Sequence, residues 1–473
     1  MPTRRGSQDR RTVRQSSPKP AGDAPKKKAD RPVVAQVDVA KIPAAPPAGK
    51  TPRRNALFPV GVNYYPLDAE TQSWDDWYKH DVSEDFRAFA EARLSIVRVY
   101  VSWKVLEPQV GQYDEEALER FAEVLASARE HKLQVIVCFF ADDRLAEMLD
   151  VPWGKRRDPR TDSYLIQREV ALVQKIVNRF RSESAIFAWD LANEAFASSF
   201  EGAKAFEAWA AEMREAIREV DAERPITMSV DPETMYRHTG VDPRNGLDDN
   251  EFLASHATAA YRAYAAEGPL TFGPSTYLDS FLLRSAAREL PVLMDDVGVF
   301  ALDNSAAEES AFVRTSLYSA FMNRAAGVMM RRYKDMDTER REPYFRDPFE
   351  VLVGLAETSG APKPAFQEVA SFIRVAARID LRRYQLAQER TAVLIPNERY
   401  APLPNLAGLY DPRACLQAYI AAKEAHIPVT VARESDEFGA YSVIIIPSTF
   451  ELEAASWERL AEFIQNGGTV VLS

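Results

Sequence analysis

The sequence predicts a (β/α)8 barrel, also called a TIM barrel, followed by a smaller α/β domain. Between residues 58 and 333, eight apolar segments alternate with segments of helical periodicity. The apolar segments are continuous rather than alternating, as in parallel strands that are covered on both faces. An open doubly wound sheet is the alternative, but the number of strand–helix units and their length favour the barrel.

The eight expected strands can be read along the chain as apolar runs. They are residues 58–65, 95–101, 133–140, 184–192, 225–230, 251–256, 291–296 and 325–333. The segments between them include YDEEALERFAEVLASAREHK and FEAWAAEMREAIREVD, in which apolar residues recur at helical spacing. The first of these predicts a solvated amphipathic helix.

After a helix around KPAFQEVASFIRVAARID, the strand–helix pattern starts again. Strands are expected at 391–397, 428–432, 441–448 and 469–473. The helix before the last strand ends at a Gly-Gly stop. The sequence therefore predicts domains at 1–54, 55–384 and 385–473. The last domain looks incomplete because it ends on an apolar strand at the last residue. Either the chain is truncated or another subunit covers this edge strand.

Residues 1–54 predict a disordered basic tail, with 14 Lys and Arg against 4 Asp and few residues able to form a core. The other 419 residues hold 45 basic and 66 acidic side chains, a net charge of −21. Such a tail can bind nucleic acid or anionic lipid, although a solvated leader is the more frequent case. The acidic body disfavours nucleic acid as a substrate.

The remaining composition predicts a cytoplasmic protein without a membrane span. No segment has the ~20 consecutive apolar residues that a span needs, and the first thirty residues contain no apolar block for a secretory signal. Cys138 and Cys415 lie far apart in different predicted domains, which argues against a disulfide framework and a thiolate zinc site. No cofactor motif is present.

Polar residues gather where the predicted strands end, and in this fold the working residues lie at those carboxyl ends. In chain order they are Arg98, Asp142, Asp143, Asn193, Glu194, His256, Asp295, Asp296, Arg331 and Arg332. Carboxylates on the fourth and seventh strands would face each other across the barrel mouth. Two opposed carboxylates are what glycoside hydrolysis needs. Trp103, Trp153 and Trp189 are either sugar platforms or core residues.

Several motifs resemble known glycosidases. GVNYYPLDAETQSWDDWYKHDVSEDFRAFAEARLSIVRVYVSWKVLEPQVGQYD resembles the start of glycoside hydrolase family 42 β-galactosidases. IFAWDLANEAF and PVLMDDVG resemble the strand-4 and strand-7 motifs of clan A glycosidases, including family 5. VIIIPSTFELEAASWERLAEFIQNGGTVV resembles part of the Rossmann-like, amidotransferase-like domain that follows the family 42 barrel. The resemblance covers roughly residues 56–473. It implies a β-galactosidase-like hydrolase of glycosides or polysaccharides, and a homo-oligomer built through the second domain.

The resemblance also implies roles for individual residues. Glu194 would be the general acid/base, and Asn193 would hold the sugar 2-hydroxyl. Arg98 would orient the nucleophile, whose place falls on Asp296. The alternatives are that Glu194 caps a loop, or that Asp295 is the working carboxylate.

Three departures from the family pattern affect this site. Asp296 replaces a Glu, which withdraws the carboxylate by roughly one C–C bond, ~1.5 Å. His256 is not followed by the usual His-x-Tyr pattern and is expected as a hydrogen-bonded wall residue rather than a base. Arg331 and Arg332 stand where an aromatic is usual, and either bind an anionic sugar or pair with nearby aspartates.

Two hypotheses follow for the function. The first is a glycoside hydrolase in which Glu194 is the acid/base and Asp296 is the nucleophile or the base for water. The second is a pseudo-glycosidase that binds carbohydrate or assists assembly. A salt bridge from Arg331 or Arg332 into the gap between the carboxylates would favour the second. Asp142 and Asp143 are adjacent and point to opposite faces of a strand, so no metal site is expected.

Overall fold

The computed structural model covers the whole chain, and most of it is described in residue detail. The predicted tail and the candidates Asp142, Asp143 and Glu194 lie outside the described residues. The described residues are 58–64, 82–141, 151, 153–154, 157–158, 161–193, 203–230, 251–256, 277, 280–281, 283–284, 291–298, 305–335, 352–380, 383, 389–396, 413–449 and 452–473.

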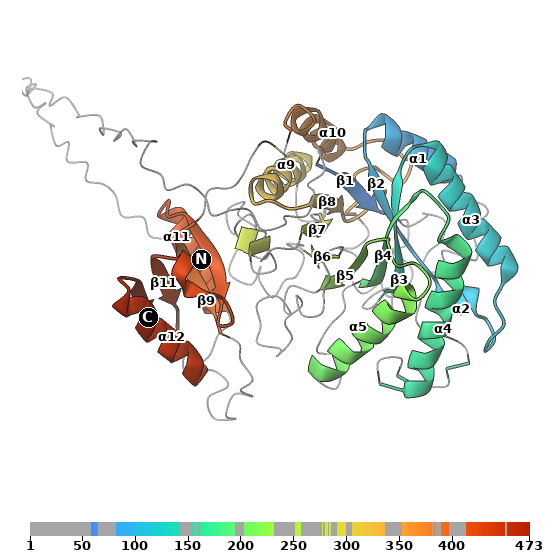
Figure 1. Cartoon of the computed structure of the whole chain (residues 1–473). Helices are drawn as coiled ribbons and strands as arrows, with labels where there is room; N and C mark the ends of the chain where they lie inside the picture. The colour runs from blue at the N-terminus through green and yellow to red at the C-terminus, as the bar shows by residue number, and fades with distance from the viewer. Residues whose placement is uncertain are drawn as a thin grey trace, which may run out of the picture. The chain divides into compact units, whose positions relative to one another are not determined.

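Eight parallel strands form a closed barrel in sequence order (Figure 1). They are β1 (Val60–Asn63), β2 (Ile96–Tyr100), β3 (Gln134–Ala141), β4 (Ile186–Asn193), β5 (Ile226–Val230), β6 (Phe252–His256), β7 (Val292–Val297) and β8 (Gly327–Met330). The pairing of β1 with β8 closes the barrel. The predicted (β/α)8 barrel is confirmed, and the open-sheet alternative is wrong.

Helices follow most of the strands, and their starts are set by local capping. They are α1 (Val82–Glu91), α2 (Trp103–Leu106), α3 (Glu115–Glu130), α4 (Ser163–Phe180), α5 (Ala203–Arg218), α9 (Ala306–Met322) and α10 (Pro364–Ala376). Asp114 and Asp162 accept backbone N–H bonds at the starts of α3 and α4, and Ser305 forms a capping box with Glu308 on α9. The apolar faces of these helices pack on the outside of the barrel.

The inside of the barrel is built in layers because side chains alternate along each strand. A small apolar cluster, separate from the core beneath the helices, contains Ile96, Ile136, Ala188, Phe252, Ala254, Leu293 and Met329. Two residues further along four of these strands, the inward positions become Arg98, Cys138, Asp190 and Asp295. The strands therefore place a polar layer directly above an apolar floor.

The C-terminal part of the chain forms a second, smaller α/β sheet, as predicted. Its parallel strands are ordered β10-β9-β11-β12. The elements are β9 (Thr391–Ile395), α11 (Arg413–Glu424), β10 (Val429–Arg433), β11 (Val443–Ile446), α12 (Ala454–Gln465) and β12 (Thr469–Leu472). The boundary between residues 384 and 385 stays a prediction.

Within the described residues, no helix has the length and apolar character needed to cross a bilayer. Cys138 and Cys415 are both buried and free. The cytoplasmic location stays a prediction.

Candidate active site

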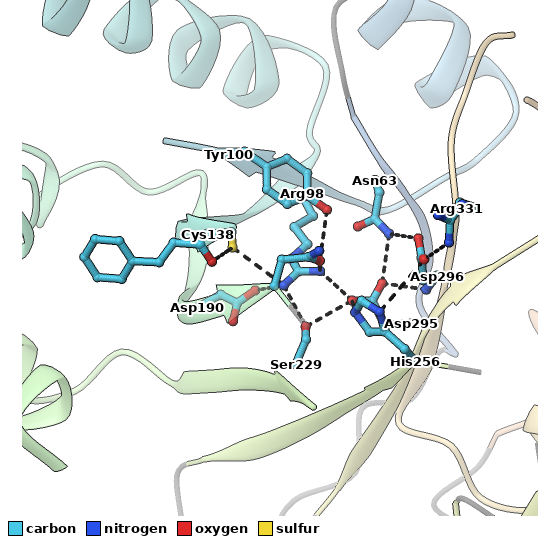
Figure 2. Close-up of polar contacts among 12 residues, drawn as sticks. Asn63, Arg98, Tyr100, Cys138, Asp190, Ser229, His256, Asp295, Asp296 and Arg331 are labelled. Atoms are coloured by element: carbon cyan, nitrogen blue, oxygen red, sulfur yellow. Dashed lines mark hydrogen bonds and ion pairs between the residues drawn. The ribbon is translucent and has the colours of Figure 1, made fainter. Parts of the chain in front are cut away.

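The polar layer at the carboxyl ends of the strands is organised around Arg98 of β2 (Figure 2). Its Nη1 donates to Asp295 Oδ2 at 2.6 Å and to Asn193 Oδ1 at 2.7 Å. Its Nη2 donates to Asp190 and, at 2.6 Å, to Ser229 Oγ. One buried guanidinium thus ties β2 to β4, β5 and β7.

The two aspartates that share Arg98 are affected differently by it. Burial raises the pKa of Asp190 to about 6, although the charge of Arg98 acts against this shift. Burial also acts to raise the pKa of Asp295. There, the charge of Arg98 and hydrogen bonds from His256 and Asn63 outweigh burial and hold the pKa well below its ordinary value. The surroundings of Asp295 thus favour its charged form, whereas burial of Asp190 favours its neutral form.

Asp295 is surrounded by donors. Besides Arg98, its Oδ2 lies 3.2 Å from Ser229 Oγ and 3.3 Å from His256 Nε2. Its Oδ1 accepts from Asn63 Nδ2 at 3.0 Å and from the backbone N–H of Asp296 at 2.8 Å. A carboxylate held by so many donors is a poor nucleophile and a good structural anchor.

A β-bulge brings the next residue, Asp296, into the same site. In the pairing of β7 with β8, Met294 lies opposite Val328 and Val297 lies opposite Met330, so β7 contains one extra residue. Asp296 lies in this bulge with a left-handed φ of 60°. Adjacent strand residues normally point to opposite faces. Here both aspartates accept from the same amide nitrogen, Asn63 Nδ2.

Asp296 is the more accessible of the two carboxylates. Its side chain is 12% exposed, against 1% for Asp295. Its Oδ1 accepts from Asn63 Nδ2 at 3.2 Å, and its Oδ2 pairs with Arg331 Nη1. His256 Nδ1 lies 3.9 Å from the same Oδ2. His256 is fully buried between the two aspartates.

The two arginines after β8 lie in different places. Arg331 is directed to Asp296, and its backbone N–H donates to Val297 O at 2.8 Å. Arg332 lines a small cavity with Glu309. Its charge also acts on Asp335, where burial raises the pKa and Arg332 opposes that shift. Of these two arginines, Arg331 is the one for which an ion pair with a β7 aspartate is described.

Two predicted roles need correction. Arg98 was expected to orient Asp296, but its guanidinium instead pairs with Asp295 and Asp190. Ordinary alternation after Leu293 makes Asp295 the inward residue of β7, and the bulge places Asp296 beside it, where it pairs with Arg331. Trp103 was expected as a possible sugar platform, but it is fully buried and its Nε1 donates to Glu107 at 2.8 Å. A stacking platform needs an exposed face, which Trp103 lacks.

The other two candidate platforms, Trp189 and Trp153, also pack against aromatic side chains. Trp189 is fully buried, stacks on Phe139 and donates through Nε1 to Asp221 at 3.0 Å. Trp153 is partly buried edge-on against Trp103.

Sequence analysis missed four residues of this layer: Asn63, Cys138, Asp190 and Ser229. Cys138 Sγ lies 3.7 Å from Arg98 Nη2, and the other three hydrogen-bond to Arg98 or to the β7 aspartates. The signal that could have found three of them is the two-residue step along each strand. Asn63, Cys138 and Asp190 each stand two residues after a small or apolar inward residue.

The arrangement around Asn193 supports sugar chemistry. Asn193 ends β4, is 8% exposed, and its Oδ1 accepts from Arg98. This bond fixes which end of the amide faces Arg98 and leaves the amide nitrogen as a donor. Among the described residues, no group of three His, Cys, Asp or Glu side chains is placed to hold a metal ion.

Residues 58–315 match the model of the cellulase family, glycosyl hydrolase family 5. Residues 398–473 match the β-galactosidase trimerisation domain.

Individual relatives are distant. A protein of Oryza sativa subsp. japonica that is named mannan endo-1,4-beta-mannosidase 5 is 24% identical over 294 residues, which cover 53% of this chain and 58% of that protein. Beta-galactosidase Bga of Halorubrum lacusprofundi is 26% identical over 151 residues, which cover 28% of this chain and 20% of that protein. The chain thus spans less than two thirds of either relative.

Among solved structures, the exo-beta-1,4-mannosidase Op5Man5 of Opitutaceae bacterium strain TAV5 has a TM-score of 0.77 at 21% identity. The match covers 89% of this chain and 78% of that one. At this identity the likeness establishes the fold.

Proposed function

We propose that this chain, which belongs to the cellulase family of glycosyl hydrolases (family 5), hydrolyses O-glycosidic bonds. The observation that carries the proposal is the pairing of Asn193 with Arg98 at the end of β4. This pairing holds the residue before Glu194 at the barrel mouth, where the accessible carboxylate of Asp296 also lies. A family 5 barrel with a carboxylate on each of these strands has the groups that glycoside hydrolysis requires.

In this proposal Glu194 is the acid/base, and Asp296 is the nucleophile or the base that activates water. The described contacts favour Asp296 over Asp295. Asp295 is fully buried and its oxygens already accept from donors on several strands, whereas Asp296 retains access to solvent. Asn193 would bind a sugar hydroxyl through its amide nitrogen.

The substrate class we propose is a neutral β-linked hexoside, such as a β-mannoside or a β-galactoside. The named activities of the relatives motivate these two sugars. The expectation of an anionic sugar loses its main support, because the charge of Arg331 is already balanced by Asp296. An anionic substituent would have to displace an existing carboxylate.

The test is turnover of a panel of aryl β-mannosides, β-galactosides, β-glucosides and β-glucuronides by the purified protein. Glu194→Gln, which has nearly the same shape but cannot donate a proton, is the matched control. We expect turnover of a neutral glycoside that is lost in the variant, and the product anomer read by NMR would show whether Asp296 attacks the sugar or activates water. Turnover retained in Glu194→Gln would contradict the assignment.

The Arg331–Asp296 ion pair also supports a second candidate function, a pseudo-glycosidase that binds carbohydrate without cleaving it. In that case the pair would close the gap in which the reaction takes place. Calorimetric binding of a mannoside or galactoside, with no release of aryl product by the wild type across the panel, would favour this candidate.

We also propose that residues 398–473 mediate association between copies of this chain. Their match to a trimerisation domain supports this proposal. Apolar side chains are also exposed on α12 and β12, namely Trp457, Ile464, Val471 and Leu472. Light scattering coupled to size exclusion measures the mass of the particle, and a monomer at micromolar concentration would argue against association.

A further inference from the structure

We infer that Arg331 positions the carboxylate of Asp296. The family resemblance implies this role, orienting the nucleophile, for Arg98. This inference rests on the proposed function, because it concerns how the reacting carboxylate is held. Three observations support it: the hydrogen bonds that Arg98 already makes, the bulge at Asp296, and the backbone and glycine contacts that direct Arg331 to Asp296.

The terminal nitrogens of Arg98 are committed to groups other than Asp296, and its Nε–H is buried without a hydrogen-bond partner among the described residues. Nη1 donates to Asn193 and Asp295, and Nη2 donates to Asp190 and Ser229. Each terminal nitrogen carries two hydrogens, so all four terminal hydrogens have an acceptor. A bond from Arg98 to Asp296 would leave a buried group unsatisfied, at a cost in stability.

Because of the bulge, the carboxylate of Asp296 is held by a cation other than Arg98. With φ at 60°, Asp296 leaves the ordinary strand path, and its carboxylate shares Asn63 with Asp295 but pairs with Arg331 rather than with Arg98. Asn63 holds one oxygen of Asp296 through a neutral amide, and Arg331 holds the other oxygen through its charge. Both bonds reach a carboxylate, but only Arg331 adds an opposite charge to the hydrogen bond, so Arg331 is the stronger of these two restraints.

The backbone guides Arg331 to this position. Its N–H is bonded to Val297 O, one residue beyond Asp296. Gly298 lies against its side chain, and a Cβ on Gly298 would come within 2.9 Å of Arg331 Cβ and of Val353 Cγ2. The absence of a side chain at Gly298 therefore lets the stem of Arg331 pass beside β7. The ion pair is also largely shielded, with side chains 13% and 12% exposed.

The first experiment compares Arg331→Met, Arg331→Lys and Arg331→Ala with the wild type on the aryl glycoside that the wild type turns over fastest. A displacement of about 1 Å at a reacting group can lower the rate by about 100-fold. We expect kcat to fall by about that factor in Arg331→Met, with little change in KM, and by less in Arg331→Lys. Ethylguanidinium chloride should restore part of the rate in Arg331→Ala, whereas sodium chloride at equal ionic strength should not.

Arg314→Met is the matched control for these variants. Arg314 lies on α9 and forms an exposed ion pair with Glu368 on α10. The same substitution there removes an arginine and an ion pair without touching the barrel mouth. Its kcat should equal that of the wild type.

A second variant, Gly298→Ala, tests the path of Arg331 without removing the guanidinium. The added methyl group should displace Arg331 and lower kcat. In an Arg331→Met background it should have a smaller effect, because both changes act on one interaction. The melting temperature of each variant separates lost positioning from unfolding.

Each outcome bears on the inference. An active wild type with unchanged kcat in Arg331→Met would overturn it and leave the proposed function standing. A kcat that rises in Arg331→Met would show that the arginine blocks the site rather than positioning Asp296. A wild type without turnover on any glycoside would remove the proposed function, and the positioning role with it.

Discussion

Asp295 and Asp296 are adjacent in the chain but lie in different surroundings. Asp295 is buried and pairs with Arg98, while Asp296 is partly exposed and pairs with Arg331. Neighbouring carboxylates with such different environments divide the work of a site between structure and chemistry.

Asp295→Asn should therefore lower stability far more than Asp296→Asn. Asp295→Asn leaves Arg98 paired with Asp190, but it puts an NH2 group among the buried donors that Asp295 accepts from. Each buried donor left unsatisfied costs about 1–3 kcal/mol. Asp296→Asn should lower the free energy of unfolding by less, because its side chain is 12% exposed, against 1% for Asp295, and water can replace part of what is lost. Urea denaturation at pH 7 measures both, and equal losses in the two variants would contradict this division of roles.

Asp190 should give the protein a characteristic pH dependence of stability. Its folded pKa of about 6 lies above its ordinary value of 3.8, so the folded protein binds the proton more tightly than the unfolded chain does. The resulting stabilisation is fully present below about pH 4 and is lost as the pH rises through 6. A shift of about two units corresponds to about 3 kcal/mol.

The measurement is the free energy of unfolding of the wild type and of Asp190→Asn between pH 4 and pH 7. The variant cannot ionise at this position, so the wild type should lose about 2 kcal/mol relative to it over that range, because the unfolded carboxyl is already half ionised at pH 4. The acid-side loss that comes from Asp295 is shared by both proteins and cancels in the difference. Parallel curves would show that Asp190 does not titrate in this window.

At the scale of the elements, the strands could be predicted because each is an apolar run of the right length. The positions of Arg98, Asn193, His256 and Asp295 followed from the rule that working residues lie at the carboxyl ends of barrel strands. The bulge could not be predicted, because it is a difference of one residue between β7 and β8 that neither strand shows alone. The burial of Trp103 depends on its packing against Trp153 and Phe140, which are distant in sequence.

At Gly61, β1 lies so close to its neighbours in the barrel that there is no room for a side chain. A Cβ at this position would lie 2.2 Å from Ile96 O and 2.8 Å from Met329 Sδ. The backbone oxygen belongs to β2, so β1 and β2 would have to separate. Gly61→Ala should thus destabilise the protein by at least about 1–3 kcal/mol.

Gly439→Ala is the control for Gly61→Ala, because a Cβ on Gly439 would meet nothing within 4 Å. Its melting temperature should stay close to that of the wild type, while that of Gly61→Ala falls. Equal melting temperatures for the two variants would mean that the barrel tolerates a side chain between β1, β2 and β8.

For the whole molecule, the order of two α/β units was visible in the sequence because the strand–helix pattern stops and restarts. The composition of the basic tail indicated that it differs from the rest of the chain, but its role has no physical signature in the sequence. The oligomeric state also could not be predicted from the pattern, because exposed apolar residues on α12 and β12 appear only once the sheet is formed.

Association through the second sheet should be sensitive to charge at this surface. Leu472 is 63% exposed on β12, so Leu472→Lys should lower the particle mass measured by light scattering if this surface joins two copies. Val110→Lys, which changes an exposed residue in the loop after α2, should leave the mass unchanged. Equal masses for both variants and the wild type would place any interface elsewhere.

We propose that this family 5 barrel uses Asp296, rather than Asp295, as its reacting carboxylate on β7. The measurement that tests it most directly is kcat of the wild type and of Asp296→Asn on the aryl β-glycoside panel, with folding confirmed by the melting temperature. We predict turnover by the wild type and its loss by at least about 1,000-fold in Asp296→Asn, as expected when a reacting group is removed. A folded Asp296→Asn variant that turns over at the wild-type rate would contradict the claim.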